Sequence, residues 1–174
     1  MTLCRSLCAG LAMLGAVPAL ALEMRPGLWE FSSDNIQVDG RAMPGMAEML
    51  EQMQALPPEQ RKMMQDMLAA QGVQPSAAGL RMCLSEAQVK SRALPFQHEP
   101  GCTQQVDEQT DRLWRFRFEC PDARGHGETR LLSEQEVVSE METQYKVGTR
   151  DGSGRMQTHG KWLGADCGSL KPRD

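Results

Sequence analysis

The C-terminal half of the chain alternates between hydrophobic and polar residues with a period of two. In the segment 113–120, the aromatic residues and the terminal cysteine share one face, whereas the arginines and the glutamate share the other. The segments 137–147 and 154–163 show the same alternation. This pattern is typical of antiparallel strands with one buried face and one face in water. It predicts a β-meander that forms a sheet or a partial barrel.

The N-terminal half begins with a predicted strand at 28–38 and then changes to a helical period. Over 43–72 the apolar residues recur at the spacing of one helical face. They are Met46, Met49, Leu50 and Met53, followed by Met63, Met64, Met67 and Leu68. Pro57 and Pro58 divide this segment into two predicted helices. Proline suits the first turn of a helix, so it marks the start of the second one. The spacing predicts a helical hairpin over about 44–72, inserted after the first strand.

Shorter elements follow this insertion. Small residues over 73–79 indicate a loop, and 80–84 indicates a short extended segment. Ser85 and Gln88 form the S-x-x-Q pattern of a capping box, which predicts a helix that ends before Pro95. The predicted fold class is therefore mainly β (α+β): an antiparallel meander sheet or partial barrel with a methionine-rich helical hairpin and one short helix.

The N-terminus has the three regions of a secretory signal peptide. Arg5 precedes an uncharged run over 6–22, and Ala19 and Ala21 place small residues at the −3 and −1 positions of a cleavage site. An uncleaved anchor is the alternative, but the run has about the minimum length for a membrane span. We expect cleavage after Ala21, so that residues 22–174 form a single periplasmic domain with no membrane span.

Export to an oxidising compartment would allow the cysteines to form disulfides. Beyond the signal peptide, four cysteines remain: Cys83, Cys102, Cys120 and Cys167. An even number in an oxidising compartment predicts two disulfides, for which three pairings are possible. Proximity in the sequence favours Cys83–Cys102 and Cys120–Cys167. A metal site with four thiolates is the alternative, and it is disfavoured because the chain has no Cys-x-x-Cys pair.

Several segments, taken in order, resemble one family. They are MRPGLWE at 24–30, RMCL at 81–84, Gly101-Cys102, the segment 114–120 and WLGADC at 162–167. This set covers nearly all of the chain after the signal peptide and resembles domain-of-unknown-function family 3617 (DUF3617), which consists of small exported proteobacterial proteins. The resemblance implies a periplasmic, disulfide-paired, β-rich domain. It implies no activity, because the family has no catalytic residues to transfer.

Charge and motifs argue against several function classes. The net charge is −4, without the basic stripe of a nucleic-acid-binding protein. The chain has no Gly-x-Ser-x-Gly elbow, phosphate-binding loop or dinucleotide motif. His98, His126 and His159 are scattered, without the spacing of metal ligands. The sequence therefore predicts no enzyme, no catalytic residue, no cofactor and no nucleic-acid partner.

The methionines are the main candidate for function, because seven of the eleven beyond the signal peptide lie over 43–67. Thioethers suit adaptable contact surfaces. The candidates for a partner or ligand surface are Met46, Met49, Met53, Met63, Met64 and Met67. The alternative is Cu(I) capture by Met46, Met49 and Met53, since soft ligands select Cu(I). Helical spacing alone explains these three residues, and no His or Cys lies between Met24 and Met82, so the sequence favours packing or partner binding.

The sequence thus predicts a non-enzymatic binding module of the cell envelope, with an unknown envelope protein as its partner. Two alternatives stay open. One is a Cu(I)-handling protein, and the other is a binder of an apolar small molecule or lipid between the hairpin and the sheet.

Overall fold

The computed structural model describes residues 23–91 and 101–172. Within these ranges the chain is mostly β-structure, with short helices. The strands are β1 (Gly27–Val38), β2 (Arg41–Ala42), β3 (Val73–Pro75), β4 (Leu80–Leu84), β5 (Thr103–Gln109), β6 (Leu113–Cys120), β7 (Ala123–Ser133), β8 (Glu136–Val147) and β9 (Arg150–Gly164). The helices are α1 (Met46–Gln54), α2 (Pro58–Ala70) and α3 (Glu86–Ser91). The predicted signal peptide lies outside the described residues.

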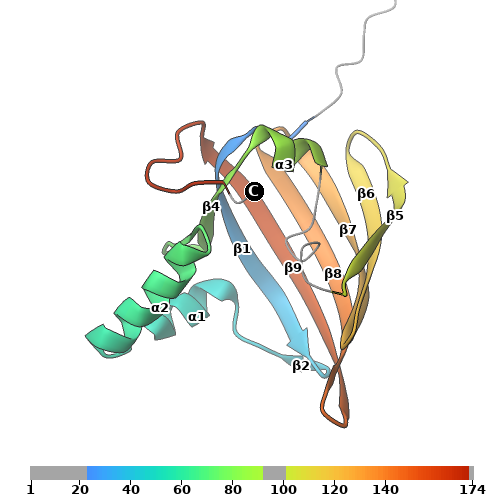
Figure 1. Cartoon of the computed structure of the whole chain (residues 1–174), viewed down its shortest axis with the longest axis horizontal. Helices are drawn as coiled ribbons and strands as arrows, with labels where there is room; N and C mark the ends of the chain where they lie inside the picture. The colour runs from blue at the N-terminus through green and yellow to red at the C-terminus, as the bar shows by residue number, and fades with distance from the viewer. Residues whose placement is uncertain (1–22, 92–100, 173–174) are drawn as a thin grey trace, which may run out of the picture.

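In the described part of the chain, the strands form one antiparallel nine-stranded sheet, which is strongly curved but not closed (Figure 1). Its order is β3-β4-β1-β9-β8-β7-β6-β5, and β2 pairs with β1. Strands β5 to β9 follow one another as a meander, and the last strand pairs with the first. This confirms the predicted mainly β fold with an antiparallel meander. The chain passes from β4 to β5 through α3 and residues 92–100, which are not described.

One face of the sheet carries the hydrophobic core. Its buried members are Trp29, Trp114, Phe116, Phe118, Leu131 and Val137. The alternation predicted for β6 sets which of its side chains are buried. Two pairs of hydroxyls lie on the same face: Ser33 Oγ is 3.0 Å from Thr158 Oγ1, and Thr129 Oγ1 is 2.9 Å from Ser139 Oγ. These contacts satisfy hydroxyl groups that would be costly to bury alone.

Glycines of β7 make room for the aromatic rings of β6. Phe116 is paired across the strands with Gly127, and Phe118 with Gly125. A Cβ atom on Gly127 would lie 2.5 Å from Phe116 Cζ, and one on Gly125 would lie 2.7 Å from Phe118 Cζ. Such distances are well below van der Waals contact. The glycines are therefore required for the rings to lie against the neighbouring strand.

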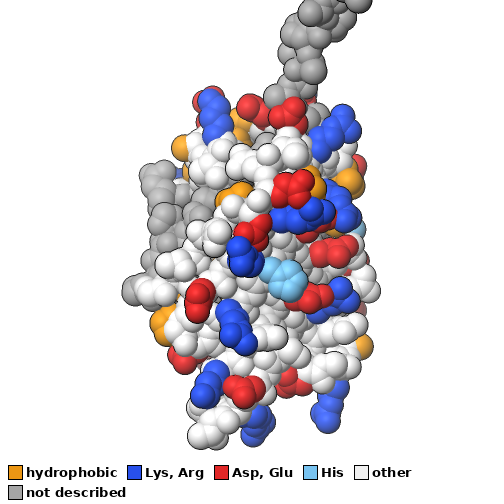
Figure 2. All heavy atoms as spheres, turned by 90° about the vertical axis from the view of Figure 1, so that its right-hand side faces the viewer, with side chains coloured by type: hydrophobic (Ala, Val, Ile, Leu, Met, Phe, Trp, Pro, Cys, Tyr) orange, Lys and Arg blue, Asp and Glu red, His pale blue; other side chains and the backbone are white. Residues whose placement is uncertain are grey.

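The opposite face of the sheet is polar and carries ion pairs between neighbouring strands. Figure 2 shows basic and acidic side chains interleaved over the side formed by β5, β6 and β7. Arg117 Nη2 lies 2.6 Å from Asp107 Oδ1, and Arg115 Nε lies 2.5 Å from Glu128 Oε2. Exposed ion pairs contribute on the order of 0–1 kcal/mol each to the stability of a fold. The main effect of these charges is therefore to keep this face of the sheet in water.

The sequence pattern does not predict two edge strands. Residues 73–75, which it assigns to a loop, form β3 against β4. β5 (TQQVDEQ) has one apolar residue, Val106, which is exposed, so it lacks the alternation that marks a buried strand. Edge strands are stabilised mainly by the backbone hydrogen bonds of one neighbour, which leave no hydrophobic pattern. The capping box, in contrast, is confirmed: Ser85 N–H donates to Gln88 Oε1, and Gln88 N–H donates to Ser85 Oγ.

Candidate functional site

Helix α1 packs on the sheet through a narrow apolar stripe. Leu50 and Met53 are buried, and the helix contacts β1. Met49, which the helical pattern places on the same face, is 41% exposed. The predicted trio of Met46, Met49 and Met53 is therefore divided, because Met53 serves packing whereas Met49 is open to solvent. This division matters for any site that needs all three sulfur atoms.

Helix α2 behaves differently, because none of its thirteen residues is buried. Met63 is 70% exposed, Met67 is 56% exposed and Met64 is 38% exposed. The helix continues directly into β3, which is its main contact, and it projects away from the sheet on the side of β1 and β4 (Figure 1). Within the described chain, the apolar side of α2 is thus presented to solvent rather than used for packing.

The position of α2 is tied to the sheet through the β3–β4 turn. Ser76 Oγ donates to Glu30 Oε2 at 2.7 Å, and Arg81 Nε donates to the same oxygen at 2.9 Å. The hydrogen bond from Ser76 and the neighbouring Arg81 guanidinium hold the pKa of Glu30 below its ordinary value, although partial burial opposes them. Because Glu30 and Ser76 are far apart in the sequence, no local signal could have revealed this contact.

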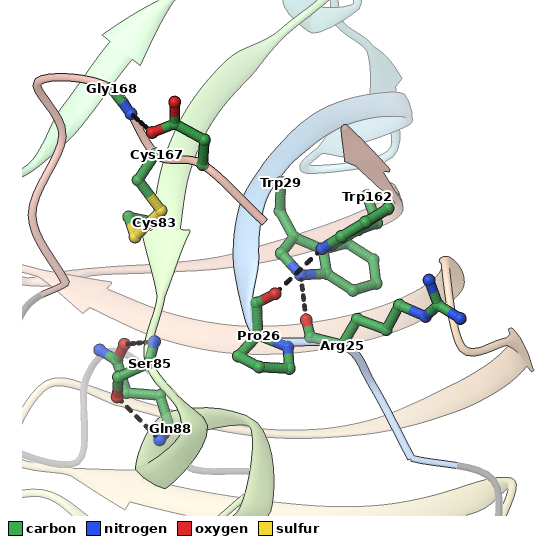
Figure 3. Close-up of a disulfide and its surroundings, with 10 residues drawn as sticks. Arg25, Pro26, Trp29, Cys83, Ser85, Gln88, Trp162, Cys167 and Gly168 are labelled. Atoms are coloured by element: carbon green, nitrogen blue, oxygen red, sulfur yellow. Dashed lines mark hydrogen bonds between the residues drawn. A yellow bond between two sulfur atoms is a disulfide. The ribbon is translucent and has the colours of Figure 1, made fainter. Parts of the chain in front are cut away.

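The N-terminal motif at 24–30 holds the start of the first strand, β1, against the end of the last strand, β9 (Figure 3). Trp29 Nε1 donates to the Arg25 carbonyl at 2.8 Å, and Trp162 Nε1 donates to the Pro26 carbonyl at 3.1 Å. The Arg25 guanidinium lies 5.3 Å from the centre of the Trp162 ring. Gly27 has φ +127°, and a Cβ there would lie 2.4 Å from the Gly164 carbonyl oxygen. The residues of this motif therefore have a structural role, because they hold β1 against β9.

The predicted cysteine pairing is wrong. Cys83 is bonded to Cys167, and Cys102 is bonded to Cys120 (Figure 3 shows the first bond). The reason is topological. Cys102 precedes β5 and Cys120 ends β6, which are paired neighbours, whereas Cys83 of β4 and the segment after β9 both adjoin β1. Two disulfides are typical of proteins outside the reducing cytoplasm.

Other chemistry on the surface is limited. His126 Nε2 lies 3.7 Å from Glu142 Oε2, and His159 Nε2 lies 3.7 Å from Asp34 Oδ2, on the polar face. His98 lies outside the described residues. Among the residues that the structure describes, no three His, Cys, Asp or Glu side chains are grouped as metal ligands. In the same part of the chain, no helix has the length and hydropathy needed to cross a membrane.

The polar face also has an open hollow of about 610 Å³, which no local sequence pattern predicts. Its lining includes a row of cross-strand neighbours: Arg117, His126, Glu142 and Arg155. Arg155 Nη2 lies 2.7 Å from Glu142 Oε1, and Arg117 is paired with Asp107. The two arginines of this row are thus already paired, one with Glu142 inside the row and the other with Asp107 outside it. These side chains occupy alternating polar positions of β6 to β9. The row could be predicted from the sequence only if the registers of these strands were known.

Comparisons with known proteins give one family. The model of a family described as "Protein of unknown function (DUF3617)" matches residues 24–167. A Pseudomonas putida protein, described as "Uncharacterized protein in lpd-3 5'region", is 46% identical over 116 residues, which cover 66% of this chain and 82% of that protein. No solved structure matches the chain. The family match spans both disulfides and the N-terminal motif, and we conclude that the chain belongs to the DUF3617 family.

Proposed function

We propose that this protein is a non-enzymatic binding module of the periplasm, which presents its methionine-rich helices, α1 and α2, to a protein partner of the cell envelope. The observation that carries the proposal is α2, a helix of thirteen residues with no buried side chain and with three exposed methionines. A helix that does not pack on its own domain needs another reason to keep an apolar side.

The chemistry of methionine supports a protein partner. Its side chain is unbranched, flexible and polarizable, so it adapts to the contours of another surface. The two helices also differ in role: α1 is held by Leu50 and Met53 on the sheet, and α2 follows it as the exposed element. The sheet and its two disulfides would then serve as the rigid support that positions α2.

Export can be tested separately from binding. The chain expressed with its own N-terminal segment should be recovered from the periplasmic fraction. N-terminal sequencing should give Leu22 as the first residue, since Ala21 occupies the −1 position of the predicted site. Recovery of the full-length chain from the membrane fraction would contradict the proposed localisation.

Binding can be tested with a photo-crosslinking amino acid placed at Met63 or at Val147. Both side chains are 70% exposed, but Val147 lies at the end of β8, away from the helices. We expect a discrete crosslinked protein from position 63 only, and its loss when Met64 and Met67 are both changed to Gln. Equal crosslinking from both positions would contradict the proposal. A lipid or apolar small molecule bound in place of a protein would appear as added mass in native mass spectrometry.

A further inference from the structure

Three thioethers lie within little more than one turn of α2. Met67 follows Met63 by four residues and Met64 by three. Side chains at these two spacings are neighbours on a helix, with Cβ atoms about 5–6 Å apart. Met63 and Met64 therefore both lie next to Met67, about one turn before it on the helix surface. Their flexible side chains can bring three sulfur atoms to one point.

The structure also shows that none of these three methionines is buried in the core. Each of the three methionines is at least 38% exposed, and α2 has no buried residue. The nearby charged groups Lys62 and Asp66 are paired with each other at 2.7 Å. The thioethers are the soft donors on this part of α2, and their side chains are accessible to a ligand.

We propose that Met63, Met64 and Met67 bind one Cu(I) ion through three thioether sulfurs. Thioethers are soft and uncharged ligands, and they select Cu(I) over hard cations such as Mg²⁺ and Ca²⁺. A monovalent cation also needs no carboxylate in its coordination shell. No electron transfer is involved, because the metal binds in the oxidation state in which it is supplied.

The tertiary structure is what points to α2 rather than to α1. The sequence pattern favours Met46, Met49 and Met53 as the copper alternative, but Met53 is buried with Leu50 and contributes to packing. Recruiting its sulfur would require α1 to separate from β1. The α2 methionines need no such rearrangement, since binding would change only side-chain rotamers. This inference goes beyond the proposed function and does not depend on it.

The test is a Cu(I) titration of the disulfide-bonded protein against a competing chromophoric Cu(I) chelator, with ascorbate as the reductant. The test variant carries Met63→Leu, Met64→Leu and Met67→Leu. The matched control carries Met43→Leu, Met46→Leu and Met49→Leu, which places the same number of changes on and before α1. Leucine keeps the apolar volume and the helix propensity, so that only the sulfur atoms are removed.

We expect the wild type and the α1 control to withhold one equivalent of Cu(I) from the chelator, and the α2 variant to withhold none. X-ray absorption at the copper edge should show sulfur ligands only. Release of all copper by the wild type, retention by the α2 variant or equal loss in the α1 control would each overturn the proposal. Because leucine preserves the apolar surface, a crosslinker at position 63 should still capture the partner when Met64 and Met67 are both changed to Leu, if the proposed function is correct.

Discussion

Gly160 of β9 lies between Phe31 of β1 and Val137 of β8, and neither neighbour leaves room for a methyl group. A Cβ at this position would lie 2.6 Å from Phe31 Cε1 and 2.6 Å from Val137 Cγ1. Gly154 lies on the same strand, but its nearest neighbour would be 3.8 Å away. The two glycines are alike in the sequence and differ only in what faces them across the strands.

We expect Gly160→Ala to lower the free energy of unfolding by about 1–3 kcal/mol, because the core must move to accept the methyl group. Gly154→Ala should change it by less than about 0.5 kcal/mol. Urea unfolding, followed by tryptophan fluorescence, measures both. Similar unfolding midpoints for the two variants would mean that the core around Phe31 is looser than the structure shows.

Glu30 links stability to pH through its contacts with Ser76 and Arg81. Its pKa is lowered in the folded state, first by the Ser76 hydrogen bond and then by Arg81. A lowered pKa stabilises the fold above the unfolded-state value, about 4.3, and this contribution is lost as the pH falls through the lowered value. We expect the stability of Glu30→Gln to fall less steeply than that of the wild type below pH 5. Parallel stability profiles of the two proteins would contradict this assignment.

At the scale of the element, the two insertion helices differ in how far they depend on the sheet. Met53 of α1 is buried, and α1 contacts β1, so Met53→Ala should destabilise the protein by about 2–5 kcal/mol. Met63 of α2 is exposed, and Met63→Ala should cost less than about 0.5 kcal/mol. The difference between their urea midpoints measures this asymmetry. A cost at Met63 as large as that at Met53 would show that α2 packs on the domain in solution.

The helical period predicts both helices, but it cannot distinguish their surroundings. Met49, Met53, Met63 and Met67 all belong to apolar stripes, yet only Met53 is buried. Which stripe meets the sheet depends on where the chain leaves β2 and enters β3. The two edge strands, β3 and β5, are missed for a related reason, because backbone pairing with one neighbour requires no hydrophobic pattern.

At the scale of the whole molecule, the two disulfides close loops of very different length. Cys83–Cys167 has a sequence separation of 84, and Cys102–Cys120 has a separation of 18. In the chain-entropy model, the long loop contributes about 4.5 kcal/mol and the short loop about 3 kcal/mol. The double variant Cys83→Ser/Cys167→Ser should therefore be less stable than Cys102→Ser/Cys120→Ser. The reverse order in urea unfolding would show that local strain outweighs loop entropy.

The local features of this protein can be predicted from its amino-acid sequence. The alternation in β6, β8 and β9, the helical period over 44–72 and the capping box at Ser85 each depend on residues close together in the chain. The disulfide pairing, the partners of Glu30 and the exposure of α2 instead follow from the tertiary structure. These depend on β9 returning to β1 and on the crossing from β4 to β5, which bring together residues that no local pattern relates.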